Sequence, residues 1–413
     1  MNDGTVHHIS SGPITGGAGR AGFRLHQGLL SIQQHSHWMQ ARMPTSESLN
    51  LTNWLKPKEK KKRLSFQRNK NEKYSRRAFK GSKTCATHPE SWGNSKFFLS
   101  KELPSIYNFH WMGGFLDWQT TLPEITKIRP VVWTLHDINP MQGAWHYAPL
   151  REEVTNERNR WDQYAYKIKE AALNAVDSSK LVFVAPSKWM LEQCKSSQLT
   201  RKFESFHIPY GLDTDLFSSL ETSTAKKALN IDPKRKVIGF IADSISDPRK
   251  GITELTKALQ AIGDTDAPLL LTVGVSDDAP AGNNRINLGS IREDRLLRIF
   301  YSACDAFICP SLQDNLPNTV LEAMACNTPV IAFNIGGLPD MVREGTSGYL
   351  VPEKDINKLA AAIKRALSSP EELKMLGAGA RELATTEFNL KLQADRYTQL
   401  YEKLLSGSGR EAT

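Results

Sequence analysis

Short apolar runs separated by polar loops recur along most of this chain and predict buried strands. Amphipathic helical patterns lie between many of these runs, an alternation that is typical of parallel α/β sheets. The fold class indicated is therefore α/β, with doubly wound parallel sheets. The expected strands are a weak one at 6–9, one that ends near 108–111, and apolar runs at 131–135, 181–185, 237–242, 269–273, 306–309 and 330–333.

The chain has 413 residues, which is enough for two domains that each bury a core. All nine tryptophans lie at or before Trp189, so the composition changes between the two halves. A helical pattern with an apolar stripe runs over 390–405, near the C-terminus. We expect a first domain over 1–215 and a second over 216–389.

The overall composition is that of a globular protein, because apolar residues make up 40% of the chain and the mean hydropathy is −0.42. No apolar run is long enough to span a membrane, and the first residues lack the charged-then-apolar pattern of a signal peptide. The five cysteines show no CxxC spacing, which favours buried free thiols in a reducing compartment over disulfides or a zinc site. A cytoplasmic location is therefore expected.

The stretch 306–352 combines the strand pattern with polar residues that suit a ligand site. A polar loop over 311–318 follows its first strand, and Pro317 is expected to open a helix because a missing N–H costs nothing there. Asn327 fits the left-handed residue that ends this helix. Glu322 falls in the apolar part of the helix, where an acid is costly to bury unless it has a partner. Ligands of parallel sheets lie at the carboxyl ends of strands, and a ribose diol is a suitable partner for this acid.

Asp314, seven further residues and Glu322 begin a longer pattern, which continues as LEAMACNTPVIA, GG, PD and EGTSGYLVP. This pattern resembles the donor-site signature of family-4 retaining glycosyltransferases of the GT-B fold. The resemblance implies two Rossmann-like domains that face a cleft, and transfer of a sugar from a UDP-, GDP- or ADP-sugar to a hydroxyl acceptor. It also implies retention at the anomeric carbon without a metal ion or another cofactor. Asp314 departs from the family, which usually has glutamate at this place.

The resemblance assigns roles to the residues around this helix. Glu322 would accept hydrogen bonds from the ribose hydroxyls. Asp314, together with the backbone N–H groups of Asn315 and Leu316, would hold the donor sugar, and Thr319 is assigned to the donor as well. No pair of carboxylates suggests a nucleophile of the glycosidase type, so the leaving phosphate itself would accept the proton of the acceptor.

Further donor contacts are expected from two loops of the second domain. Lys250 matches the family lysine that clamps the diphosphate. The family arginine of the same loop is missing, since Asp243 stands near its place, and Arg249 is the candidate replacement. The alternative for both basic residues is a pair of solvated charges. Backbone groups of Ser290 and Ile291 resemble the family segment beside the nucleobase.

A glycine-rich loop at Gly16, Gly17, Ala18 and Gly19 follows the first strand. With Gly22 it matches the dinucleotide fingerprint G-x-G-x-x-G, but the acid expected about twenty residues later is absent. The favoured interpretation, which the family shares, is that backbone N–H groups face the donor diphosphate with help from the helix dipole. A dinucleotide cofactor site and a mere tight turn are the alternatives.

His136 and Asp137 end a buried strand, a place where ligands often lie. The alternative is a structural histidine that is hydrogen-bonded to the backbone. The family has a histidine here that contacts the donor sugar, so His136 is assigned to orient it. The segment 136–147, HDINPMQGAWHY, resembles enzymes of exopolysaccharide and lipopolysaccharide assembly, although Asn139 and Trp145 depart from their pattern.

Positive charge is concentrated in residues 56–83, where thirteen Lys and Arg stand against two Glu for a net charge of +11, whereas the whole chain carries +9. This segment lies within a polar insertion over 40–103. It is either a solvated insertion or a docking surface, because basic residues interleaved with Trp54 and Phe66 suit an anionic membrane that carries a lipid-linked acceptor. The second interpretation predicts peripheral attachment at the inner face of the membrane. No recognition motif supports nucleic acid.

The resemblance also orders the two domains by role. The first is expected to serve the acceptor, with the C-terminal helix 390–413 packing back onto it, and the second to bind the donor. Asp213-Thr214-Asp215 is a literal DxD motif, but it lies in a linker-like context, so no metal site is assigned to it. The main expectation is polysaccharide or glycolipid assembly. The alternatives are a synthase that acts on a free sugar phosphate or polyol, and a non-catalytic sugar-nucleotide-binding protein.

Overall fold

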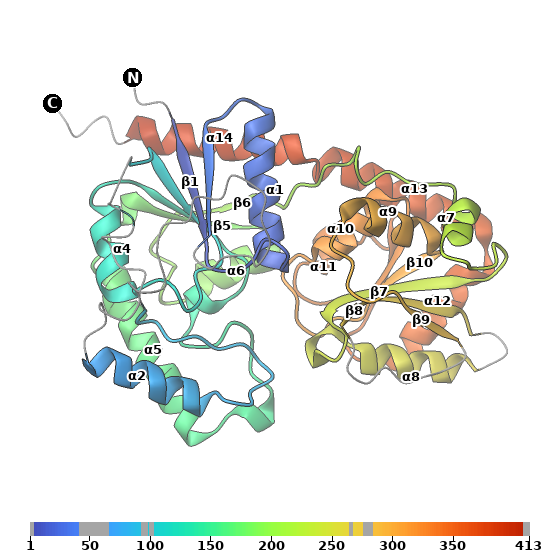
Figure 1. The fold of residues 1–413 in the computed structure, drawn as a ribbon, viewed down its shortest axis with the longest axis horizontal. Coiled ribbons are helices and arrows are strands. Elements are labelled where there is room, and N and C mark those ends of the chain that lie inside the picture. Colours follow the sequence, from blue (N-terminus) through green and yellow to red (C-terminus); the bar gives the residue numbers. More distant parts are fainter. Residues whose placement is uncertain are drawn as a thin grey trace. The chain divides into compact units, whose positions relative to one another are not determined.

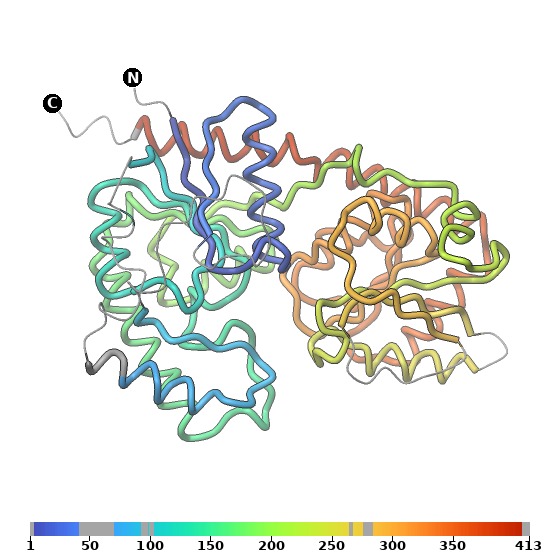
Figure 2. The backbone as a smooth tube through the Cα atoms, in the orientation of Figure 1, coloured from blue at the N-terminus to red at the C-terminus, as the bar shows by residue number. Residues whose placement is uncertain are grey.

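The computed structural model describes residues 4–40, 66–91, 98, 103–263, 267–275 and 284–407. The chain divides into two compact units, which Figures 1 and 2 trace along the sequence. Unit 1 consists of Met1–Pro209 and Gln393–Thr413, and unit 2 of Tyr210–Leu392. This boundary lies a few residues before the one expected from the sequence.

Unit 1 is built on a six-stranded parallel sheet with the strand order β2-β1-β3-β4-β5-β6. Long helices connect most of these strands, as expected for a doubly wound sheet. Its strands and main helices are β1 (Val6–Ser10), α1 (Gly17–Ser31), β2 (Ser36–Gln40), α2 (Phe66–Ala78), β3 (Ile106–Phe109), α4 (Trp118–Thr126), β4 (Val131–Thr134), α5 (Asn156–Asn174), β5 (Leu181–Ala185), α6 (Lys188–Ser196) and β6 (Ser205–His207).

Unit 2 has a second six-stranded parallel sheet, with the order β12-β11-β10-β7-β8-β9. The α/β fold class predicted from the sequence is thus confirmed for both units. The elements are α7 (Thr222–Ala228), β7 (Val237–Ser244), α8 (Ile252–Ile262), β8 (Leu269–Val275), β9 (Arg285–Asn287), α9 (Asp294–Ala303), β10 (Ala306–Cys309), α10 (Asn318–Ala325), β11 (Val330–Phe333), α11 (Leu338–Met341), β12 (Gly348–Val351), α12 (Ile356–Ser368) and α13 (Pro370–Glu387). The last helix, α14 (Leu390–Gly407), belongs to unit 1 from Gln393 onward.

Each sheet has one point at which the strand order reverses direction. In unit 1 this point lies between β1 and β3, and in unit 2 between β7 and β10. The loops that leave two such strands diverge, so a crevice opens at their carboxyl ends, where ligands of doubly wound sheets bind. These two places are where functional residues are expected.

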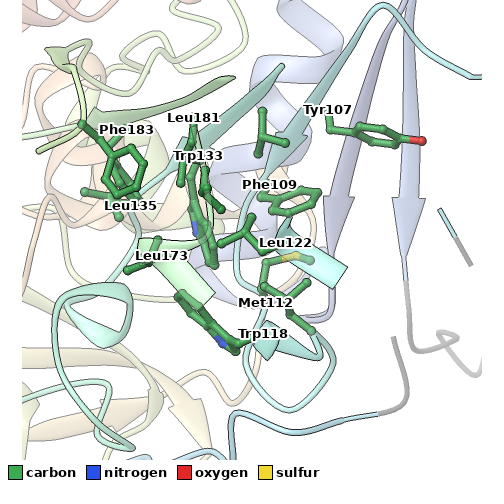
Figure 3. Packing of buried hydrophobic residues seen from close by; sticks show 14 of the residues in the cluster. Tyr107, Phe109, Met112, Trp118, Leu122, Trp133, Leu135, Leu173, Leu181 and Phe183 are labelled. Atoms are coloured by element: carbon green, nitrogen blue, oxygen red, sulfur yellow. The ribbon is translucent and has the colours of Figure 1, made fainter. Parts of the chain in front are cut away.

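The sheet of unit 1 is buried on both faces, which explains its continuous apolar strands. Trp133 and Phe183 face one core with Phe109, Trp118 and Leu122, as Figure 3 shows. Alternate strand residues face a second core, in which Tyr397 and Tyr401 of α14 pack against Val6, Ile106, Val132 and Val182. The hydroxyl of Tyr401 accepts a hydrogen bond from Asn108 at 2.7 Å, and that of Tyr397 pairs with Thr134 at 2.8 Å. The C-terminal helix is therefore an integral part of unit 1.

The helix α10 begins one residue later than expected, with Pro317 as its N-cap. Asn327 has a φ of 59°, which confirms the predicted left-handed residue after the helix. The residues that flank Glu322 in this helix are apolar and fully buried: Val320, Leu321, Ala323 and Met324. This local packing fixes the direction from which Glu322 enters the core.

Part of the predicted insertion packs against unit 1. The carboxylate of Glu153 accepts hydrogen bonds from the Ser82 hydroxyl at 2.6 Å and the Thr84 N–H at 3.0 Å, and Glu90 accepts one from Tyr164 at 2.7 Å. These residues pack against the rest of unit 1, whereas the basic residues Lys73, Arg76, Arg77 and Lys80 are exposed, as expected for a solvated face. The residues 41–65 and 92–97, which include much of the basic segment, lie outside the described part of the chain. The membrane interpretation of 56–83 stays a prediction.

In the described residues, no helix has the length and apolar character needed to cross a membrane. The five cysteines are free thiols; Cys194, Cys304, Cys309 and Cys326 are buried, whereas Cys85 is exposed. Burial raises the pKa of Cys309 to about 11 and that of Cys326 to about 12, so these buried thiols stay protonated and unreactive at neutral pH.

Candidate functional site

An ion pair marks the point in unit 2 where the strand order reverses. Lys250 ends a short 3₁₀ turn, Pro248–Lys250, that follows β7, and Asp314 lies in the loop that follows β10. The Lys250 Nζ atom is 2.6 Å from Asp314 Oδ2. Their side chains are 27% and 13% exposed, so both remain partly accessible to a ligand. The structure thus brings together two residues that are 64 positions apart and were both assigned to the donor.

Two glycines allow these loops to approach each other. Gly251 has a φ of 75°, and a Cβ atom there would lie 1.8 Å from the carbonyl oxygen of Pro310. Gly336 has a φ of 52°, and a Cβ atom there would lie 1.9 Å from the carbonyl oxygen of Asp314. Only glycine fits such positions without a backbone shift. The close approach of the two loops therefore explains why Gly251 follows Lys250 and why Gly336 begins the GG pair.

Glu322 lies on α10, eight positions after Asp314, and only 1% of the residue is exposed. One of its carboxylate oxygens, Oε2, accepts a hydrogen bond of 2.7 Å from the hydroxyl of Tyr301, which is fully buried. A buried carboxylate needs such a donor, because an uncompensated one is costly. Tyr301 lies on α9 and was not found in the sequence, where it reads as an ordinary core aromatic.

The other predicted donor residues of unit 2 lie along the same edge of the sheet. Asn315 is buried, and its N–H donates to Asp314 Oδ1 at 3.1 Å. Leu316 is also buried, whereas Thr319 is half-buried. Ser290 and Ile291 follow the edge strand β9, which is separated from β7 by β8.

The side chain of Arg249 pairs with a different carboxylate from that of its neighbour Lys250. Its guanidinium forms an ion pair of 2.5 Å with Asp247, and the Arg249 N–H donates to the same carboxylate. The backbone carbonyl of Arg249 accepts a hydrogen bond of 2.7 Å from the N–H of Leu312, which joins the loops after β7 and β10. The structure therefore gives Arg249 a clear part in shaping the loop, and its role as a second diphosphate clamp stays a prediction.

The glycine-rich loop of unit 1 follows β1, at the other reversal point. Gly16 is the N-cap of α1, and Gly17 and Ala18 begin the helix. Gly19 and Gly22 are required by packing, since a Cβ atom would lie 2.0 Å from the carbonyl oxygen of Pro13 or 2.7 Å from the ring of His110. The tight-turn interpretation thus accounts for part of the G-x-G-x-x-G match, and the phosphate interpretation stays a prediction for Gly16 to Gly19.

His136 follows β4 and is almost completely buried, with its Nε2 atom 3.0 Å from Nδ1 of His110. Burial lowers the pKa of His136 to about 4, although the Asp137 carboxylate opposes this shift. The ring is therefore neutral at pH 7. This contact joins two side chains, and the role of His136 in orienting the donor sugar stays a prediction.

Asp137, the residue after His136, belongs to a second polar cluster. Its Oδ2 atom is 2.5 Å from His146 Nδ1 and accepts a hydrogen bond of 2.8 Å from Trp111 Nε1. His146 Nε2 is 2.8 Å from the Thr87 hydroxyl, so the packed part of the insertion reaches this cluster. A small pocket beside it is lined by His110, Trp111, Trp118, Trp133, His136, Asp137 and His146, among other residues.

A buried lysine shapes the loop after β4. Lys169 on α5 is 1% exposed, and its ammonium group donates to the carbonyls of Asn139 at 2.6 Å and Gly143 at 2.6 Å. It also lies 4.8 Å from the ring centroid of Trp118. Burial lowers its pKa to about 7. Asn139, which departs from the subgroup pattern, thus has a structural task here.

In the described residues, no group of three or more His, Cys, Asp or Glu side chains is arranged to hold a metal ion. The DxD motif has a local role instead, because Asp213 Oδ1 accepts hydrogen bonds from the N–H groups of Asp215 and Leu216 at 3.0 Å each. Asp213 therefore stabilises its own turn.

Comparison with known proteins identifies relatives of both sequence and fold. Residues 235–369 match the family model described as "Glycosyl transferases group 1". Alpha-maltose-1-phosphate synthase of Mycolicibacterium smegmatis is 27% identical over 295 residues, which cover 65% of this chain and 74% of that protein.

Two solved structures show the same fold over nearly the whole chain. Sucrose-phosphate synthase from Thermosynechococcus elongatus aligns with a TM-score of 0.71 and 21% identity, covering 98% of this chain and 99% of that one. Anabaena HepE, in a complex with UDP-glucose, aligns with a TM-score of 0.61 and 15% identity over 98% and 99% of the two chains. Unit 2 thus matches the group 1 glycosyltransferase family over residues 235–369, and the chain has the GT-B fold of these solved structures, with one parallel sheet in each unit.

Proposed function

We propose that this glycosyltransferase moves a sugar from a nucleoside diphosphate sugar to a hydroxyl group, with retention at the anomeric carbon and without a metal ion. The observation that carries the proposal is the Lys250–Asp314 pair at 2.6 Å, beside the helix that buries Glu322. A cation and a carboxylate meet where the strand order reverses, and a buried acid lies on the helix that follows the carboxylate. These are the groups that a diphosphate, a sugar and a ribose diol require.

In this mechanism the protein mainly stabilises the departing diphosphate. Lys250 supplies a fixed positive charge, and the N–H groups at the start of α10 supply partial positive charge. Asp314 binds the sugar hydroxyls once Lys250 turns to the phosphate. The leaving phosphate accepts the proton of the acceptor, and His136, which is neutral at pH 7, acts as a hydrogen-bonding group instead of an acid or base.

The acceptor is proposed to be a small soluble molecule that carries a phosphate. The names of alpha-maltose-1-phosphate synthase and sucrose-phosphate synthase both contain a phosphorylated small carbohydrate. These relatives favour the soluble-acceptor alternative over polysaccharide assembly. The complex of HepE with UDP-glucose supports a sugar nucleotide as donor.

Donor binding can be tested with UDP-, GDP- and ADP-sugars in thermal unfolding. At a ligand concentration one hundred times the Kd, the matching donor should raise the free energy of unfolding by about 2.7 kcal/mol. The matched control is Glu322→Ala, in which the same donor should give a smaller shift. Release of nucleoside diphosphate by the wild type is the second measurement. The proposal is wrong if no sugar nucleotide stabilises the protein and none is turned over.

Chelation separates this mechanism from metal-assisted transfer. Because Lys250 and the start of α10 are proposed to stabilise the diphosphate, EDTA should leave the initial rate of transfer unchanged. The rate should also be the same after dialysis against chelator and after readdition of Mg²⁺ or Mn²⁺. A large loss of rate with EDTA that Mg²⁺ restores would contradict the metal-free mechanism.

A further inference from the structure

Three histidines form a hydrogen-bonded chain through the interior of unit 1. His8 is on β1, His110 follows β3 and His136 follows β4, and these three strands are neighbours in the sheet. His8 Nδ1 is 2.9 Å from His110 Nε2, and His110 Nδ1 is 3.0 Å from His136 Nε2. All three residues are at most 8% exposed.

Each ring in this chain is neutral and carries one N–H. Burial lowers the pKa of His136 to about 4 and that of His8 and His110 well below the ordinary value. The neighbouring rings also repel each other's positive charge. Because each contact needs one donor and one acceptor, only two arrangements of the three protons satisfy both hydrogen bonds.

The two arrangements differ at the ends of the chain. In the first, His8 Nδ1–H donates to His110, His110 Nδ1–H donates to His136 Nε2, and His136 keeps its proton on Nδ1. In the second, every bond runs the other way, so His136 carries its proton on Nε2 and His8 carries its proton on its own Nε2.

The surroundings of His8 distinguish the two arrangements. In the described part of the chain, His8 Nε2 is buried and has no hydrogen-bond partner. The second arrangement would place an N–H there, and buried N–H groups without an acceptor are rarer in proteins than incompletely satisfied acceptors. The geometry also suits an in-plane N–H···N bond, because the rings of His8 and His110 are tilted by only 19°, with centroids 5.2 Å apart.

We propose that His8 and His110 are positioning residues that hold His136 as the neutral tautomer protonated on Nδ1. His136 then carries its N–H on Nδ1, and an N–H is the kind of donor that suits a sugar hydroxyl oxygen. The part of this inference that concerns the sugar rests on the proposed function. The assignment of the tautomer does not depend on the proposed function.

The tautomer can be read from the side-chain ¹⁵N and ¹H signals of the ¹⁵N-histidine-labelled full-length protein. The chain has ten histidines, so His136→Gln and His110→Gln serve to assign the two rings. We expect His136 and His110 to show protonated Nδ1 and bare Nε2. A protonated Nε2 on His136 would overturn the proposal, whether or not the protein transfers sugar.

A pair of His8 variants tests the positioning role. Asparagine can place its side-chain N–H near the position of the histidine Nδ1, whereas phenylalanine keeps the ring but has no donor. We expect His8→Phe to mix the His136 tautomers and lower kcat about tenfold with little change in KM for the donor. His8→Asn should retain the tautomer and most of kcat.

The outcomes separate this inference from a purely structural role and from the proposed function. If both variants lose stability equally while the tautomer and kcat stay as in the wild type, His8 is not a positioning residue. If His8→Phe mixes the tautomers without lowering kcat, the chain does not orient the sugar. If the wild type turns over no sugar nucleotide, the proposed function fails, and the ¹⁵N spectra still decide the tautomer.

Discussion

Replacing Glu322 by alanine should lower kcat/KM for sugar transfer by roughly a hundredfold or more, a loss of about 3 kcal/mol. The carboxylate is proposed to accept two hydrogen bonds from the ribose hydroxyls. Hydrogen bonds to charged groups each contribute about 1.5–3 kcal/mol when one partner is removed. The side chain is almost fully buried, so water cannot easily take its place. Initial rates over a range of donor concentrations would measure the loss.

Two milder variants separate loss of the carboxylate from damage to the core. Glu322→Gln keeps the volume and one acceptor, so it should fold like the wild type and still lose much of the activity. Tyr301→Phe removes the hydroxyl that donates to Glu322 Oε2 at 2.7 Å, and should cost about tenfold in kcat/KM. Wild-type kcat/KM in Glu322→Ala would overturn the assignment of this residue.

The sequence was sufficient to predict the parts of this site that depend on local pattern. Buried parallel strands are continuous apolar runs, so β4, β5, β7 and β10 could be located from the order of apolar residues along the chain. Pro317 and Asn327 bound the helix α10 because each has a specific backbone preference. An acid within that apolar helix pointed to a required partner; Tyr301 donates one hydrogen bond to it, and the expected ribose diol stays a prediction.

The identity of that partner could not be predicted, because Tyr301 and Glu322 lie on different helices. They are 21 positions apart in the sequence. A buried tyrosine in a helix has the same sequence pattern whether its hydroxyl meets a carboxylate or a backbone carbonyl. The histidine chain was missed for the same reason, since His8 and His110 are 102 positions apart and meet only through the order of the strands.

Edge strands and the insertion were also hard to predict. The strand β2 has the sequence SHWMQ, and its polar residues hide the pattern of a strand. The insertion contains many basic residues, yet it attaches through two carboxylates: its own Glu90 accepts a hydrogen bond from Tyr164, and its Ser82 donates one to Glu153. Charge composition describes the surface of such a segment, whereas a few buried carboxylates determine where it attaches.

Replacing Lys250 by alanine should also reduce kcat/KM by roughly a hundredfold or more, about 3 kcal/mol. Two effects add in this variant. The diphosphate loses its fixed positive charge, and Asp314 loses the cation that lies 2.6 Å from its carboxylate. The unpaired carboxylate then repels the donor phosphates. Steady-state kinetics and donor binding by calorimetry would both register the change.

The second effect predicts a rescue that a simple loss of charge would not give. In Lys250→Ala/Asp314→Asn the repulsion is removed, so donor Kd should be tighter than in Lys250→Ala alone, and the two substitutions should be non-additive. Arg249→Ala is the matched neighbour, and its loss should be smaller because that guanidinium pairs with Asp247 at 2.5 Å. Two results would mean that the Lys250–Asp314 pair is not the diphosphate clamp. One is strict additivity of the binding free energies in the double-mutant cycle of Lys250→Ala and Asp314→Asn. The other is an equal loss of kcat/KM in Arg249→Ala and Lys250→Ala.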